Sequence, residues 1–172
     1  MRIAGKSYSH IGTWGPVEIS DSFVARTNKL ISASGNGEAK FYVGGKQDKS
    51  LRDFFGKSKF LMRAFFAKDE LVSFMEEMKV HYVKESSNYR ALNTLPTLWK
   101  SRITELKLKS SKELWFDAAE QDAGGQRRCY IKGDGNFELL RELPLPDLAV
   151  VMIDKYKSSA GDFVFKFRFV VR

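Results

Sequence analysis

Residues 163–171 alternate strictly between two kinds of side chain. Four phenylalanines and Val171 occupy the odd-numbered positions, and the even-numbered positions carry Lys166 and Arg168 between two valines. Successive side chains of a β-strand point to opposite faces of a sheet, so this period of two predicts a strand with its phenylalanine side in the core. We expect Phe163, Phe165, Phe167 and Phe169 all to be interior.

Other segments supply partners for this strand. Residues 148–156 are rich in Val and Ile, and a short stretch containing Gly161 separates them from the last strand, which predicts an antiparallel hairpin. Residues 113–116 and 126–132 flank the turn signal Gly124-Gly125 and predict a second hairpin. Residues 23–31 and 38–43 also favour strands, joined through a Gly-containing turn.

Helical spacing is clearest over residues 69–82, where Leu71, Phe74, Met75 and Met78 recur at intervals of three and four. Residues 50–55 favour a shorter helix. Residues 99–108 are interpreted as a strand, with a bulge where the apolar positions change parity between Ile103 and Leu106. The predicted fold is a strand-dominated α+β domain, a partly open antiparallel or mixed β-barrel (pseudobarrel) with one or two helices.

The chain has 172 residues, which suits a single domain spanning 1–172, either complete or a fragment of a longer protein. It contains no apolar run long enough to cross a membrane and no secretory signal at its start, so a cytoplasmic protein is expected. With one cysteine, Cys129, and two histidines, it offers neither a disulfide framework nor a zinc-ligand set. No metal or cofactor is expected.

The net charge is +8, from 29 Lys and Arg against 21 Asp and Glu. Residues 1–66 hold 11 basic and 5 acidic groups, and residues 91–112 hold 5 and 1. Such a surplus favours a polyanionic partner, double-stranded DNA in the first place. Arginine can bind a guanine edge through two hydrogen bonds, and lysine neutralises phosphates. The candidate DNA-binding residues are basic or polar side chains in turns or on strand faces: Arg26, Asn28, Lys29, Lys46, Gln47, Lys49, Lys100, Arg102, Arg127 and Arg128.

Enzymatic chemistry finds little support in the sequence. Gly-Lys-Ser occurs at 5–7 and 56–58, but neither copy has the preceding glycine of a phosphate-binding loop. A metal-dependent restriction-type nuclease needs an Asp on one strand and Glu-x-Lys on the next. Glu105 and Lys107 have the second form on a predicted strand, although no suitably placed Asp precedes them. We therefore expect no catalytic activity in this chain alone and keep the nuclease as an alternative function.

The order of these elements suggests a family. Strands over 23–43, a short helix at 50–55, a helix at 69–82 and a series of strands ending at 163–171 resemble the pseudobarrel DNA-recognition domains of restriction enzymes, of the EcoRII N-terminal and LlaJI specificity-subunit types. Related domains occur in plant transcription factors. The resemblance implies that the domain grips duplex DNA with two arms and reads the major groove, while cleavage resides elsewhere.

The sequence thus predicts a non-enzymatic specificity module that binds duplex DNA, within a restriction or other host-defence system. Other subunits of a restriction complex are expected partners, and no membrane partner is expected. Besides the nuclease, a protein-binding accessory domain is a further alternative, in which the basic residues are incidental.

Overall fold

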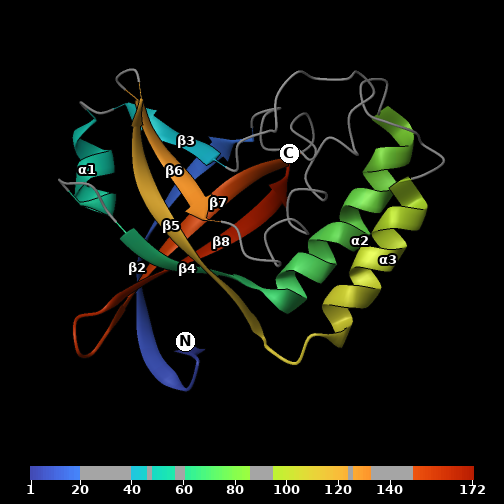
Figure 1. The fold of residues 1–172 in the computed structure, drawn as a ribbon, viewed down its shortest axis with the longest axis horizontal. Helices are drawn as coiled ribbons and strands as arrows, with labels where there is room; N and C mark the ends of the chain where they lie inside the picture. Colours follow the sequence, from blue (N-terminus) through green and yellow to red (C-terminus); the bar gives the residue numbers. More distant parts are fainter. Residues whose placement is uncertain (20–39, 46–47, 57–60, 86–94, 124–125, 133–148) are drawn as a thin grey trace.

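The computed structural model describes residues 1–19, 40–45, 48–56, 61–85, 95–123, 126–132 and 149–172. These residues form a strand-dominated α+β fold built on a curled sheet, with the strand order β1-β2-β7-β8-β4-β5-β6-β3 (Figure 1). Its strands are β1 (Arg2–Ile3), β2 (Lys6–Glu18), β3 (Lys40–Gly45), β4 (Leu61–Ala67), β5 (Glu113–Ala123), β6 (Gln126–Lys132), β7 (Ala149–Ser158) and β8 (Phe163–Val171).

Both hairpins predicted from the sequence are confirmed. β7 pairs with β8 in antiparallel register, and β5 pairs with β6 across residues 124–125. In β8 the alternation holds as expected for Phe165, Phe167 and Phe169, which are buried. Phe163 does not follow them, because 45% of it is exposed. It stands at the first position of the strand, beyond the side chains that cover the rest of the phenylalanine face.

Two long strands were not expected. β2 runs through the Ser- and Gly-rich segment around His10 and pairs with β7 along most of its length, with irregularities between His10 and Gly12 and between Trp14 and Val17. β4 lies between β8 and β5, parallel to the first and antiparallel to the second. The expected strand at 38–43 is present as β3, which pairs with β6. The expected strand at 23–31 lies outside the described residues.

The described residues contain three helices, α1 (Lys49–Phe55), α2 (Lys68–Glu85) and α3 (Leu95–Leu108). The first two were predicted. Asp48 caps α1, its carboxylate accepting from the backbone N–H groups of Ser50 and Leu51. The strand predicted for 99–108 is wrong: this segment is helix α3. Ile103 and Leu106 are three residues apart, so the change of parity reflects a helical period.

The main core fills the concave side of the sheet. α1 contributes Leu51 and Phe55 to it and α2 contributes Leu71, Phe74, Met75 and Met78. These side chains pack on the phenylalanines of β8; the rings of Phe55 and Phe165, for example, are stacked with centroids 5.9 Å apart. α3 packs mainly on α2, which separates it from the sheet, and adds Leu106.

A smaller apolar cluster lies on the opposite face of the sheet. Ile3, Phe65, Tyr156 and Val164 are buried there, with Trp115 partly buried against them. Both faces of the central strands β4 and β8 are therefore covered. This explains why Val164 and Lys166, on the face of β8 opposite the phenylalanines, are also buried.

Candidate functional site

The end of the sheet at β3, β6 and α1 brings together three of the predicted DNA-binding residues. In the β3–β6 ladder Arg127 is paired with Gly44, and Arg128 with Tyr42. Lys49 begins α1 four residues after β3 ends, and α1 contacts β3. Lys49 is exposed and makes no ion pair with any described residue. We call Lys49, Arg127 and Arg128 the β3–β6 group.

Lys100 and Arg102 lie elsewhere. Both are on α3, which lies with α2 at the opposite side of the sheet from α1 (Figure 1). Lys100 is exposed, and Arg102 donates to Glu105 at 3.1 Å. The expectation that Lys100 and Arg102 share the face of a strand is wrong, since residues two apart on a helix point in different directions. The remaining candidates, Arg26, Asn28, Lys29, Lys46 and Gln47, lie outside the described residues.

The helical state of 95–108 removes the premise of the nuclease alternative. Glu105 and Lys107 are not on a strand, and each is engaged with another side chain: Glu105 with Arg102 at 3.1 Å, and Lys107 with Glu76 of α2 at 2.9 Å. Across the described ranges, no three His, Cys, Asp or Glu side chains are grouped so that they could hold a metal ion. Glu105 serves as a surface charge that pairs along and beside its helix.

A second basic group was predicted only in part, through Lys100. The connection from α3 to β5 folds against the start of α2, where the Lys68 ammonium donates to the carbonyl of Lys109 at 2.7 Å and the Lys68 N–H to the carbonyl of Lys112 at 2.8 Å. The excess of basic over acidic residues in 91–112 could have indicated this group, but only the fold shows that Lys68 lies beside Lys109. Lys100, Lys109 and Lys112 belong to this second group.

Several other cations are neutralised by carboxylates. Arg63 pairs with Asp117 at 3.2 Å, and Arg172 pairs with Glu18. Lys166 and Arg168, on the face of β8 opposite the phenylalanines, are engaged with acidic groups in a largely buried network. The basic surface is therefore confined to fewer positions than the net charge of the chain suggests.

Asp154 of β7 is the centre of that network. Only 5% of it is exposed. Its carboxylate accepts from Arg168 Nε at 2.8 Å and from the hydroxyl of Thr13 at 2.7 Å, and Lys166 Nζ lies 3.7 Å away. His10 Nε2 is 3.1 Å from the same hydroxyl, so the network reaches from β8 across β7 to β2.

Burial and charged partners set the direction in which the pKa values of Asp154 and Lys166 are shifted. Burial acts to raise the pKa of Asp154, but the hydrogen bonds from Arg168 and Thr13 and the charges of Arg168 and Lys166 lower it overall. Burial acts to lower the pKa of Lys166, but Glu70, whose carboxylate accepts from it at 2.9 Å, raises it overall, helped by Tyr156 and Asp154. Asp154, Lys166 and Arg168 are thus charged at neutral pH. The network holds β2, β7, β8 and α2 together.

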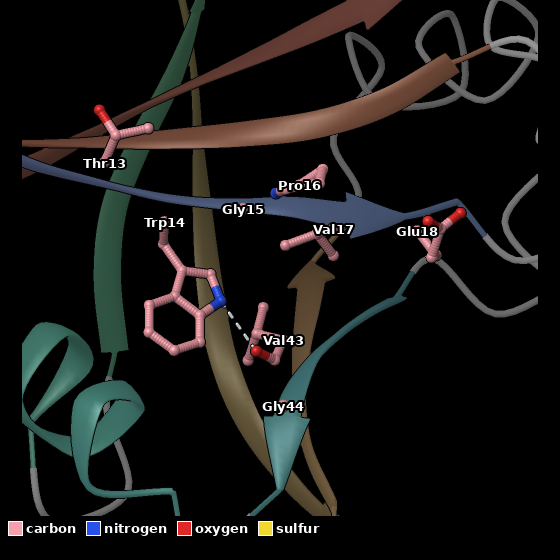
Figure 2. Close-up of a pocket in the computed structure, with 8 residues that line it drawn as sticks. All are labelled: Thr13, Trp14, Gly15, Pro16, Val17, Glu18, Val43 and Gly44. Atoms are coloured by element: carbon pink, nitrogen blue, oxygen red, sulfur yellow. Dashed lines mark hydrogen bonds between the residues drawn. The ribbon is translucent and has the colours of Figure 1, made fainter. Parts of the chain in front are cut away.

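A groove of about 590 Å³ opens between β2 and β3. It is lined by Thr13, Trp14, Gly15, Pro16, Val17, Glu18, Val43 and Gly44. Figure 2 shows the Trp14 side chain extending from β2 toward β3, where its indole Nε1 donates to the carbonyl of Val43 at 2.8 Å. Gly44, which lines the groove, is the residue paired with Arg127 on the next strand.

No family model matches the chain, and neither a curated protein nor a solved structure is similar to it. Among the described helices, none is both long enough and apolar enough to span a membrane.

Proposed function

We propose that this chain is a non-enzymatic module that binds duplex DNA through the β3–β6 group and the groove beside it. The observation that carries the proposal is the meeting of Lys49, Arg127 and Arg128 at one end of the sheet, in a chain with a net charge of +8. Asp48, the acidic neighbour of Lys49, uses its carboxylate to cap α1. The charge of Lys49 therefore remains available to phosphates.

The proposal includes the pseudobarrel fold. Two features support it. The sheet is strongly curled, and β2, which is an edge strand beyond the two residues that pair with β1, approaches the other edge strand, β3, at the Trp14–Val43 hydrogen bond. In the described residues no ladder joins these two strands, so the barrel is open along this line. We call this line the seam. The unpaired backbone N–H and C=O groups along the seam and the arginines of β6 can then contact the same ligand.

The expected roles of the lysine and the arginines in DNA binding follow from the chemistry of their side chains. Lys49 contributes a point charge that neutralises phosphate without regard to sequence. An arginine can donate two parallel hydrogen bonds to a guanine edge. Because Arg127 and Arg128 are consecutive on β6, one of them supplies the specificity of the module and the other adds positive charge. We infer that the module serves a restriction or other host-defence system whose cutting activity resides in another domain or subunit.

The test is a fluorescence anisotropy titration of a labelled duplex of random sequence, repeated between 50 and 300 mM salt. The proposal predicts that the logarithm of the association constant falls linearly with the logarithm of the salt concentration, by about 0.9 per phosphate contact. Binding that is undetectable at 50 mM, or unchanged by salt, contradicts it. A protein that co-purifies with the chain while no duplex is shifted would instead favour the accessory-domain alternative.

A selection from randomised duplexes, read by sequencing, then tests the specificity part of the proposal. Specific readout predicts enrichment of a short motif, because each correct base contact contributes about 1 to 3 kcal/mol of discrimination. A selected pool with no motif would reduce the proposal to binding by charge alone.

A further inference from the structure

Lys155 of β7 lies in an aromatic enclosure at the open end of the concave face. Its ammonium nitrogen is 4.5 Å from the ring centroid of Phe163, 5.6 Å from that of Phe54 and 5.8 Å from that of Phe165. It donates one hydrogen bond, to the backbone carbonyl of Phe54. Within the described part of the chain, no carboxylate lies within 4 Å of it. This amine is thus held in place without a counter-charge.

The neighbouring strand makes room for this arrangement. Gly12 of β2 is paired with Lys155 and has no side chain; a Cβ atom there would lie 3.6 Å from the Phe54 ring. The Phe54 ring therefore lies over β2 at van der Waals distance and closes one side of the enclosure. The charged groups next to Lys155 in the sequence do not reach it: Asp154 points to the opposite face of the sheet, into its network with Arg168.

Two effects act on the charged form of this amine: the ring faces attract it, and burial without a carboxylate partner disfavours it. Accordingly, burial lowers the pKa of Lys155, so that a larger fraction of this side chain is neutral at a given pH than for an ordinary lysine. Enclosure of a lysine by apolar side chains is one of the ways in which enzymes obtain a nucleophilic amine. Phe163, one wall of the enclosure, is 45% exposed, which gives small molecules access.

From this geometry we propose that Lys155 is a nucleophilic amine and a site of covalent modification by aldehydes that carry an apolar or aromatic body. In the reaction the Nζ lone pair attacks the carbonyl carbon, and the carbonyl oxygen takes up a proton to give a carbinolamine. The proton that the oxygen takes up is balanced by one lost from the nitrogen. The hydroxyl then leaves as water with the one proton that remains on the nitrogen, and the C=N double bond of an imine forms. The phenylalanine walls favour an aromatic aldehyde because they bury its ring.

Lys157 is a matched internal control. It lies two residues further along the same face of β7, is exposed, and its Nζ is 5.7 Å from the same Phe163 ring. It differs from Lys155 in having neither the Phe54 and Phe165 rings nor the carbonyl of Phe54 around it. A difference in reactivity between Lys155 and Lys157 therefore reports the enclosure and not the strand or its end.

The experiment treats the folded chain with benzaldehyde and sodium cyanoborohydride at pH 7 for short times and measures the modified fraction of each lysine by peptide mass spectrometry. We expect Lys155 to be labelled at least about fivefold faster than Lys157. As the pH is raised, the labelling rate of Lys155 should level off at a lower pH than that of Lys157. The fast site must disappear in Lys155→Arg. Equal or slower labelling of Lys155, parallel pH profiles for the two lysines, or a fast site that persists in Lys155→Arg would overturn the proposal.

Discussion

Trp14 on β2 and Val43 on β3 are joined by a hydrogen bond of 2.8 Å across the seam, from the indole Nε1 to the backbone carbonyl. Trp14 also packs on α1, with its ring centroid 5.8 Å from that of Phe54 and 5.9 Å from that of Phe55. A single side chain thus links the two edge strands to the helix that carries Lys49. The shape of the proposed DNA-binding end depends on this residue.

Replacing Trp14 with Phe keeps an aromatic ring and removes the N–H donor. We expect the free energy of unfolding to fall by about 1 to 2 kcal/mol, since the carbonyl of Val43, a buried residue, loses its partner. Urea denaturation followed by circular dichroism measures this loss. Trp115→Phe is the control, because Trp115 is also partly buried but donates no hydrogen bond to a described residue. Equal losses for the two variants would contradict a role for the Trp14–Val43 hydrogen bond.

Gly15 lies beside Trp14 with φ +131°, and a Cβ atom there would stand 2.9 Å from both the Val151 carbonyl and the Met152 sulfur. Gly15→Ala should therefore cost both backbone strain and a clash, together about 2 to 3 kcal/mol. Gly161 separates the two effects, because its φ is +94° and nothing lies within 4 Å of its Cβ position. Thermal unfolding should show a smaller loss for Gly161→Ala; a loss as large as that of Gly15→Ala would rule out the clash.

Asp154→Asn should be strongly destabilising. The substitution removes the carboxylate from a largely buried network and leaves Lys166 and Arg168 facing an amide. Loss of one partner of a buried ion pair costs about 3 to 5 kcal/mol, and the partial exposure of Arg168 places the expected cost at the lower end of that range. Chemical denaturation at pH 7 measures it. A loss below about 1 kcal/mol would contradict the central place given to Asp154.

The same residue makes stability depend on pH in acid. Because the pKa of Asp154 is lower in the folded chain than in the unfolded chain, the unfolded chain binds more protons as the pH falls through this range. Its contribution is complete above about pH 4 and is lost as the pH falls through the folded pKa. Unfolding free energies measured from pH 7 to pH 2 should fall less steeply in acid for Asp154→Asn than for the unaltered chain. Equal slopes would contradict this.

Local patterns in the sequence were enough to predict the hairpins and two of the helices. The alternation at Phe165, Phe167 and Phe169 reflects the sheet directly, because those side chains face one continuous core. The segment 99–108 was misinterpreted as a strand. Its apolar residues Trp99, Ile103 and Leu106, at intervals of four and three, fit either a helix or a strand with a bulge. Long-range packing against α2, which no local pattern contains, selects the helix.

The same limit applies to the candidate site. Lys49 and Arg127 are far apart in the sequence, and only the β3–β6 ladder places them at one end of the sheet. Conversely, the sequence pattern of β8 does not show that Lys166 and Arg168 are neutralised, because the carboxylates that pair with them, Glu70 and Asp154, come from other elements. Charge along a sequence predicts a surplus, but its distribution over the surface depends on the fold.

The most direct test of the account compares two variants that each lose three positive charges. The first carries Lys49→Gln, Arg127→Gln and Arg128→Gln; the control carries Lys100→Gln, Lys109→Gln and Lys112→Gln, from the second basic group. For duplex binding, the account predicts that the first variant lowers the salt slope by about 2 to 3 and that the control keeps most of the slope. Equal slopes for the two variants, or a larger loss in the control, would contradict a DNA interface at the β3–β6 group.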